Sequence, residues 1–172
     1  MPLFKPPDNF KFDKPNEWAH WKQTFMRFHS CSKLGEESEE LQVDSLLYSM
    51  GPQAETVFSQ LVFAAEADKK KFKTVVEKLD AYFKPMTNVI YERARLNERV
   101  QQDGESVEAF ITSVYELAEH CGYQGVAKDE HIRDRIVTGI KDKEVSRALQ
   151  LEAGLTLSRA VEMVRHSALV KC

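Results

Sequence analysis

The sequence predicts an all-α protein built as two small helical bundles. Glycine and proline are scarce, with 7 and 6 copies in 172 residues, and they fall between segments whose apolar residues recur every three to four positions. No segment shows the strict alternation of apolar and polar residues that marks a half-buried strand. A break at Lys84–Asn88, where Pro85 disfavours helix, divides the chain into two parts of similar length. We therefore expect about nine helices in two bundles.

The first part is expected to consist of an extended N-terminal arm at residues 1–15 and a helical lobe at residues 16–84. Four of the six prolines lie in the arm, which leaves room only for extended chain. Asn16 is a good N-cap for the first helix. The aromatic side chains that follow it recur at spacings of three, four and three, and they form an aromatic stripe of Trp18, Trp21, Phe25 and Phe28. We expect this stripe to pack in the core, with contact to a neighbouring subunit as the alternative.

Three more helices are expected in this lobe. Acidic residues follow Ser38 in the first turn of one helix, where they favour the helix dipole, and Gly51 with Pro52 ends it. The last helix of the lobe is expected to begin near Asp68. The residues expected to line the three helices are Leu41, Leu46, Leu47 and Met50, then Val57, Phe58 and Leu61, then Phe72, Val75, Val76, Leu79, Tyr82 and Phe83.

The second part is expected to form a lobe of five helices at residues 87–170. They are expected from Asn88 to about Val100, from Ser106 to Gly122, through Ile132 and Ile136 to Gly139, through Val145, Ala148 and Leu149 to about Gly154, and from Thr156 onward. The helix capped by Ser106 is the most clearly amphipathic. Its apolar stripe is Val107, Phe110, Ile111, Val114, Leu117, Ala118 and Cys121.

Charge is nearly balanced along the chain, whose formal net charge is −3. Of the 24 lysines and arginines 11 lie before residue 84, together with 13 of the 27 aspartates and glutamates. Neither part has the positive excess with which a dedicated nucleic-acid binder displaces counterions from phosphates. We therefore expect RNA to be bound only indirectly or weakly.

Cysteine usage and hydropathy indicate a reducing, aqueous compartment. Cys31, Cys121 and Cys172 are odd in number and lack metal-ligand spacing, so we expect reduced thiols and no metal. No apolar run approaches the ~18 residues that span a bilayer, and the N-terminus does not resemble a signal peptide. We expect a cytoplasmic protein without membrane contact.

No catalytic motif is present in the sequence. It lacks a phosphate-binding glycine-rich loop, a Gly-x-Ser-x-Gly elbow, a metallopeptidase His-x-x-x-His pair and the aspartic-protease triplet. His29 lies near Cys31 and His120 is adjacent to Cys121, but adjacent residues on a helix point about 100° apart and do not converge. We expect a protein that is not an enzyme and has no cofactor or small-molecule substrate.

Two groups of basic residues are candidates for polyanion contacts. They are Lys69, Lys70 and Lys71, at the start of a helix, and Arg93, Arg95 and Arg99. The simpler interpretation is that they are solvated helix faces. The alternative is that identical subunits in a ring gather them into a pore that binds phosphates or RNA.

Residues 8–63 carry the first of two signatures. A Trp-bearing helix with the pattern Asn-Glu-Trp-x-x-Trp-x-x-x-Phe precedes Glu-Glu-Leu-Gln-Val-Asp-Ser-Leu-Leu-Tyr-Ser-Met-Gly-Pro-Gln-Ala. This order resembles the Gag capsid region of Gypsy-type (Metaviridae) LTR retrotransposons, or of a domesticated protein derived from it. The resemblance covers roughly residues 8–168.

The second signature lies in the second part, in the spacing of Gln101, Glu105, Val107, Phe110 and Val114. It is similar to the major homology region of retroviral capsids. Gln101 and Glu105 flank a turn that enters a helix, where an amide and a carboxylate can satisfy free backbone N–H groups.

The chain departs from the retroviral pattern at two positions. Ser113 stands where that pattern has arginine, so no charge network through position 113 is inferred. The glycine that directly follows the glutamine in the pattern comes later here, at Gly104, which leaves the turn geometry open.

The resemblance implies a capsid subunit that encloses retrotransposon RNA in a virus-like particle. Its first lobe would form rings of five or six subunits and its second would link rings by dimerising. Gag proteins of this kind often carry a Cys-x-x-Cys…His…Cys zinc knuckle after the capsid, so packaging is expected to rely on a segment beyond Cys172 or on charges gathered by assembly. Two alternatives remain: a domesticated Gag adaptor that binds a partner peptide or helix in a groove, and an RNA-binding module.

Overall fold

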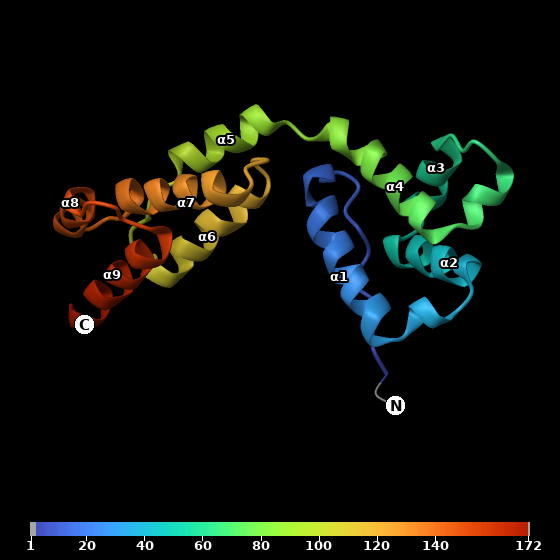
Figure 1. Ribbon diagram of the computed structural model, residues 1–172, viewed down its shortest axis with the longest axis horizontal. Coiled ribbons are helices and arrows are strands. Elements are labelled where there is room, and N and C mark those ends of the chain that lie inside the picture. The colour runs from blue at the N-terminus through green and yellow to red at the C-terminus, as the bar shows by residue number, and fades with distance from the viewer. Residues whose placement is uncertain (1–2, 172) are drawn as a thin grey trace. The chain divides into compact units, whose positions relative to one another are not determined.

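The computed structural model describes residues 3–171 and confirms the predicted all-α class. These residues form nine α-helices and no strand (Figure 1). The helices are α1 Trp18–Cys31, α2 Glu39–Met50, α3 Gln53–Gln60, α4 Phe72–Phe83, α5 Val89–Glu98, α6 Val107–Glu119, α7 Gly125–Gly139, α8 Lys143–Leu151 and α9 Leu157–Val170. No helix in this part of the chain has both the length and the apolar character needed to cross a bilayer.

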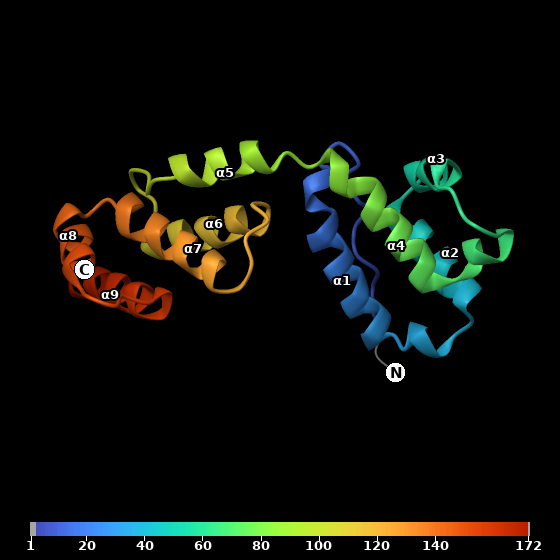
Figure 2. The same ribbon diagram turned by 45° about the horizontal axis from the view of Figure 1, so that its top comes forward.

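The chain divides into two compact units, Met1–Thr87 and Asn88–Cys172, each with its own apolar core. In the first unit α4 packs against both α1 and α2, and α3 packs against α2 (Figure 2). Four short 3-10 segments accompany these helices, at Pro15–Glu17, Leu34–Glu36, Glu66–Lys70 and Lys84–Met86.

The aromatic stripe of α1 lies in the core of the first unit. Trp18 and Phe25 are buried, and Trp21 and Phe28 are partly buried against them. The rings of Trp18 and Trp21 stack at 5.8 Å between centroids, and those of Trp21 and Phe25 at 5.7 Å. The indole of Trp18 also donates a 2.8 Å hydrogen bond to Asp80 Oδ1 of α4, which fixes α1 against that helix.

The segment before α1 contributes to the same core, which the sequence did not indicate. Phe10 is only 4% exposed, and its ring packs edge-on against those of Phe12, Trp18 and Phe83. Its backbone N–H donates to the carbonyl of Met50 at 3.1 Å. Residues 3–11 contain no helix, but the end of this segment is therefore held on the bundle.

Three local expectations in the first unit are wrong. Asn16 does not cap α1 but lies inside the 3-10 segment Pro15–Glu17, since proline at the first position favours helical backbone there. Residues 66–70 form a separate 3-10 segment, so α4 begins at Phe72 and not near Asp68.

The third error concerns Leu41, which is 45% exposed although it was expected to line α2. At about 100° per residue, a side chain two positions from Val43 points roughly 200° away from it. Val43 lies in register with Leu46, Leu47 and Met50 on the buried face and takes the place expected for Leu41.

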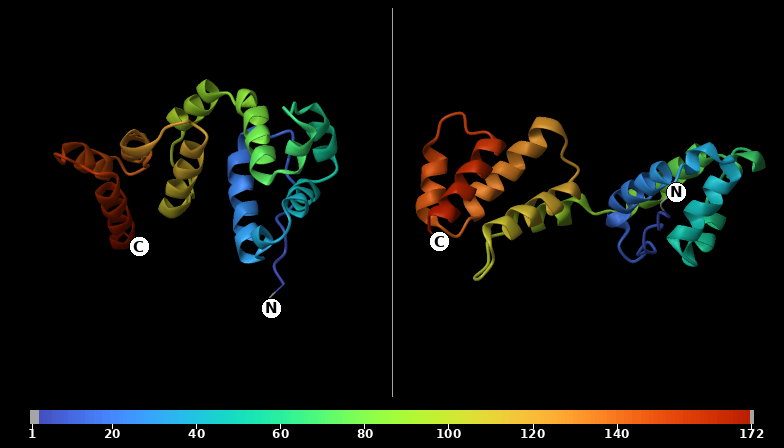
Figure 3. Two further views of the ribbon diagram at one scale, coloured as in Figure 1. Left: turned by 45° about the vertical axis from the view of Figure 1, so that its right-hand side comes forward. Right: turned by 90° about the horizontal axis from the view of Figure 1, so that it is seen from below.

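In the second unit α6 and α7 pack together, and α9 contacts both of them as well as α8 (Figure 3). The core contains Phe110, Ile111, Val114 and Ala118 of α6 and Cys121 from the turn after it, together with Leu96, Ile132, Ile136, Leu149, Ala160 and Val164 from the other helices. Ser106 accepts a hydrogen bond from Ala109 N–H at the start of α6, and Thr156 does the same for Arg159 N–H at the start of α9. On α8 the inward positions are Ser146 and Leu149, whereas Ala148 is exposed.

We expect Phe110→Ala to unfold the second unit selectively. Phe110 is fully buried, and removal of its ring leaves a large cavity, so the free energy of unfolding should fall by ~3–5 kcal/mol. Urea titration followed by the amide NMR signals of α6 measures this loss. Thr112→Ala, at an exposed position of the same helix, is the matched control. A Phe110→Ala variant as stable as the control would contradict the placement of this ring.

Candidate functional site

The turn between α5 and α6, at residues 99–105, is closed by the side chains of Gln101 and Glu105. Glu105 Oε1 accepts a hydrogen bond from the Gln102 N–H at 3.0 Å, and Gln101 Nε2 donates to the Glu105 carbonyl at 2.9 Å. Gln101 Oε1 accepts from the N–H of Lys141, just after α7, at 3.0 Å. The side chain of Gln101 therefore forms one hydrogen bond within the turn and another with Lys141, 40 residues further along the chain.

Arg99, at the C-terminal end of α5, supplies the positive charge of this turn. Its guanidinium pairs with Glu105 and donates from Nε to Ser113 Oγ at 2.9 Å. The Arg99 and Glu105 side chains are each only 18% exposed. The hydrogen bond from Arg99, supported by the Gln102 N–H, holds the pKa of Glu105 below its usual range.

A charge network therefore does reach position 113, which the sequence did not indicate. Ser113 stands where the retroviral pattern has arginine, and its hydroxyl accepts a hydrogen bond from the guanidinium of Arg99, which directly follows α5. The sequence feature that could have predicted this contact was Arg99, an arginine two positions before Gln101. It was assigned instead to the candidate polyanion contacts.

Gly139, the last residue of α7, lies against this turn without space for a side chain. A Cβ atom there would come within 2.8 Å of Phe110 Cζ and 2.9 Å of the Arg99 carbonyl oxygen. The Gly139 carbonyl accepts a 2.8 Å hydrogen bond from the Gln101 N–H. Close backbone approach thus requires glycine here, and it joins the end of α7 to the turn.

The apolar positions of the second signature lie directly behind the turn. Phe110 and Val114 are fully buried, and Val107 packs partly buried against the same core. The Arg99 guanidinium carbon lies 5.3 Å from the Phe110 ring centroid. Polar and apolar positions of the signature therefore meet in one structural unit that fixes α5, α6 and the end of α7.

The six candidate polyanion contacts all have partners inside their own units. Lys69, Lys70 and Lys71 pair with Glu66, Glu40 and Asp68, at 3.1, 3.3 and 2.9 Å, respectively. Arg93 donates to the Cys121 carbonyl at 2.9 Å, and its guanidinium carbon lies 4.4 Å from the Tyr123 ring centroid. The guanidinium of Arg95 lies 3.9 Å from the Glu92 carboxylate. Arg99 pairs with Glu105 in the turn. These charges are largely compensated within one chain, which counts against a ready-made phosphate site.

The cysteines in the described residues are a buried Cys121 and an exposed Cys31. Burial, with a smaller contribution from Glu92, raises the pKa of the Cys121 thiol, which also donates to the Leu117 carbonyl. Residues 3–171 contain no cluster of three His, Cys, Asp or Glu side chains that could hold a metal ion. Cys172 lies outside the described residues.

Comparison of the chain with protein-family models, with curated proteins and with solved structures gives no match.

We expect Glu105→Gln to lower stability near neutral pH and to lose this effect in acid. Because the folded-state pKa of Glu105 is lowered, its carboxylate stabilises the folded unit above the unfolded-state pKa of about 4.3. This contribution disappears as pH falls through the folded-state pKa.

Urea titrations of α6 amide signals between pH 7 and pH 3 measure the difference between the variant and the original protein. The difference should shrink as pH falls below about 4.3. Glu116→Gln is the control for the loss of one charge, because Glu116 is an exposed residue of the same helix whose carboxylate has no ion pair within residues 3–171. An unchanging difference at all pH values would show that the Arg99–Glu105 pair does not stabilise the turn.

Proposed function

We propose that this chain is a structural capsid subunit of the Gag type, which assembles with copies of itself into a shell. The observation that carries the proposal is the turn at residues 99–105. Gln101, Glu105 and the apolar residues behind them have the spacing of the major homology region, and both polar side chains bond to backbone groups of the turn or of Lys141. A turn fixed in this way suits a subunit that must present the same surface in every copy.

The division of the chain supports the same proposal. Each unit buries its own apolar core, and a unit with its own core can contact neighbours as a rigid body. By the resemblance to Gag capsids, the first unit forms rings of five or six subunits and the second links the rings by dimerising. Many weak copies of such contacts add up to a stable shell.

RNA enters this proposal as cargo that the chain contacts weakly or indirectly. The net charge is −3, and the six candidate contacts from Lys69 to Arg99 are engaged with groups of their own unit. We propose that packaging of retrotransposon RNA relies on another segment or on charges that assembly brings together. The particle would form in the cytoplasm, and the chain would act in it without catalysis.

Assembly of the purified protein tests the proposal. Because copies must overcome weak pairwise affinity, particles should appear with rising protein concentration, and their amount should depend on ionic strength. Negative-stain electron microscopy, with light scattering after size exclusion, follows this over a matrix of both variables. A protein that stays monomeric throughout the matrix would rule out the shell.

A further inference from the structure

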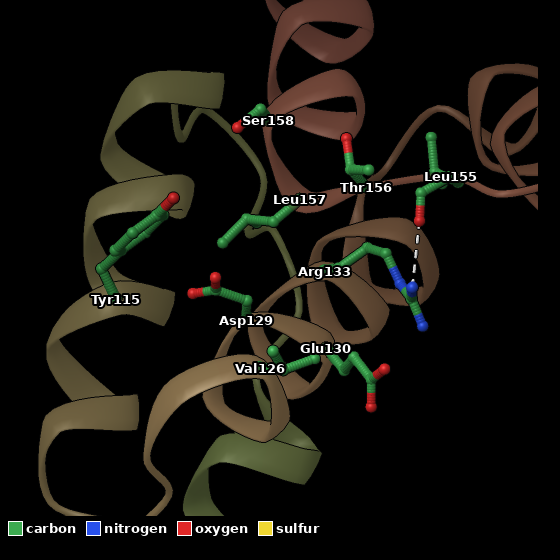
Figure 4. A pocket seen from close by; sticks show the side chains of 9 residues that line it. All are labelled: Tyr115, Val126, Asp129, Glu130, Arg133, Leu155, Thr156, Leu157 and Ser158. Carbon is green, nitrogen blue, oxygen red and sulfur yellow. Dashed lines mark hydrogen bonds between the residues drawn. The ribbon is translucent and has the colours of Figure 1, made fainter.

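The second unit carries an open pocket between α6, α7 and the start of α9. Its volume is about 480 Å³. Figure 4 shows Asp129 among the side chains of Tyr115, Val126 and Leu157, while Glu130 and Arg133 point toward the other side. Val126 is 74% exposed and Tyr115 40% exposed, so this apolar surface lies open to a partner.

Negative charge in this pocket is not compensated within the unit. Neither the Asp129 nor the Glu130 side chain has an ion pair or hydrogen bond in the described part of the chain. Arg133, the one cation among the described residues that line the pocket, already donates to the Leu155 carbonyl at 3.0 Å and pairs with Asp134 at 2.9 Å. The pocket therefore suits an apolar side chain with a cation beside it.

The outer face of α8 presents this combination. Leu149 and Ser146 face the core, and Ser146 Oγ donates to the Val137 carbonyl at 2.6 Å, which fixes the rotation of the helix. The opposite face exposes Arg147 and Leu151, which is 86% exposed. Arg147 has no internal ion pair among the described residues. As residues four apart on a helix, Arg147 and Leu151 lie ~5–6 Å apart on one face.

We propose that α8 of one copy docks in the α6–α7–α9 pocket of a second copy, with Leu151 on Val126 and Leu157 and with Arg147 beside Asp129. The spacing supports this pairing. On α7 the Asp129 carboxylate follows Val126 by three residues, whereas on α8 the Arg147 cation precedes Leu151 by four. When α7 of one copy and α8 of the other lie antiparallel, Leu151 therefore faces Val126 in the same register in which Arg147 faces Asp129.

This inference deepens the proposed function and rests on it, because it names the contact through which second units associate. Each copy carries both α8 and the pocket. The contact can therefore close reciprocally into a dimer or repeat from copy to copy, and both arrangements use the same residues.

Charge reversal tests the contact in the full chain. Arg147→Glu, and separately Asp129→Lys, should each weaken association at least ~10-fold, because like charges then face one another. An equal mixture of the two variants should recover association, since each α8 then meets a pocket of opposite charge. Sedimentation equilibrium at ~50 and ~500 mM salt measures this, and the charge effects should shrink at the higher salt.

Two controls accompany the test. Arg27→Glu reverses an exposed arginine of α1 that has no ion pair among the described residues, and it should leave second-unit association unchanged. Far-UV circular dichroism checks that every variant is folded. Reversal variants that associate like the original protein, or a mixture that fails to recover association, would overturn the proposed contact.

The outcomes separate this contact from the shell itself. Charge-sensitive association without particles in any condition would support the contact and contradict the capsid proposal. Particles that form equally from Arg147→Glu would support the capsid proposal and overturn the contact. A chain that is monomeric in all conditions would overturn both the capsid proposal and the contact between copies. The pocket would then be expected to bind a basic helix of another protein.

Discussion

The second unit depends on the closure of the turn between α5 and α6. Arg99 and Glu105 pair where both are only 18% exposed, and Gln101 bonds to the turn and to the segment after α7. Without this closure, α5 would be joined to the bundle by its apolar contacts and by polar contacts such as the hydrogen bond from Arg93 to the Cys121 carbonyl. The polar groups of this turn therefore fix the end of α5 relative to α6 and to the end of α7, and their partners must all be present because an unpaired buried group is costly.

In the first unit, contacts between aromatic rings are the main interactions that hold the helices together. The rings of Trp18, Trp21 and Phe25 stack in succession, the Trp18 ring packs at a tilt against Phe83, and Phe10 from the preceding segment packs edge-on against Phe83. Polar anchors hold this apolar contact in register. The Trp18 indole and the Lys22 ammonium both donate to Asp80, at 2.8 and 2.9 Å. Large planar side chains give much buried area per residue, which suits a unit of this size.

Charges divide into two groups in the second unit. Arg99, Arg133 and Arg165 are paired with carboxylates of their own chain, and the Arg99 pair fixes the turn between α5 and α6. Arg147 and Asp129 have no such partner among the described residues, and they adjoin exposed apolar side chains. A contact between two copies of the chain needs charged side chains that are not already paired within the folded unit. This division is the physical basis of the proposed contact between copies.

Local interactions allowed the sequence to determine the helices. Apolar periodicity and caps such as Ser106 and Thr156 act within about four residues, and they correctly predicted the all-α class, the number of helices and most helix ends. The tertiary structure alone decided which distant groups meet. The Arg99 pairing with Glu105 and Ser113, the contact of Gly139 with the turn and the burial of Phe10 depend on segments that pack together only after the helices assemble. Sequence spacing could place Gln101 and Glu105 in a turn, but the partners that hold them come from elsewhere in the chain.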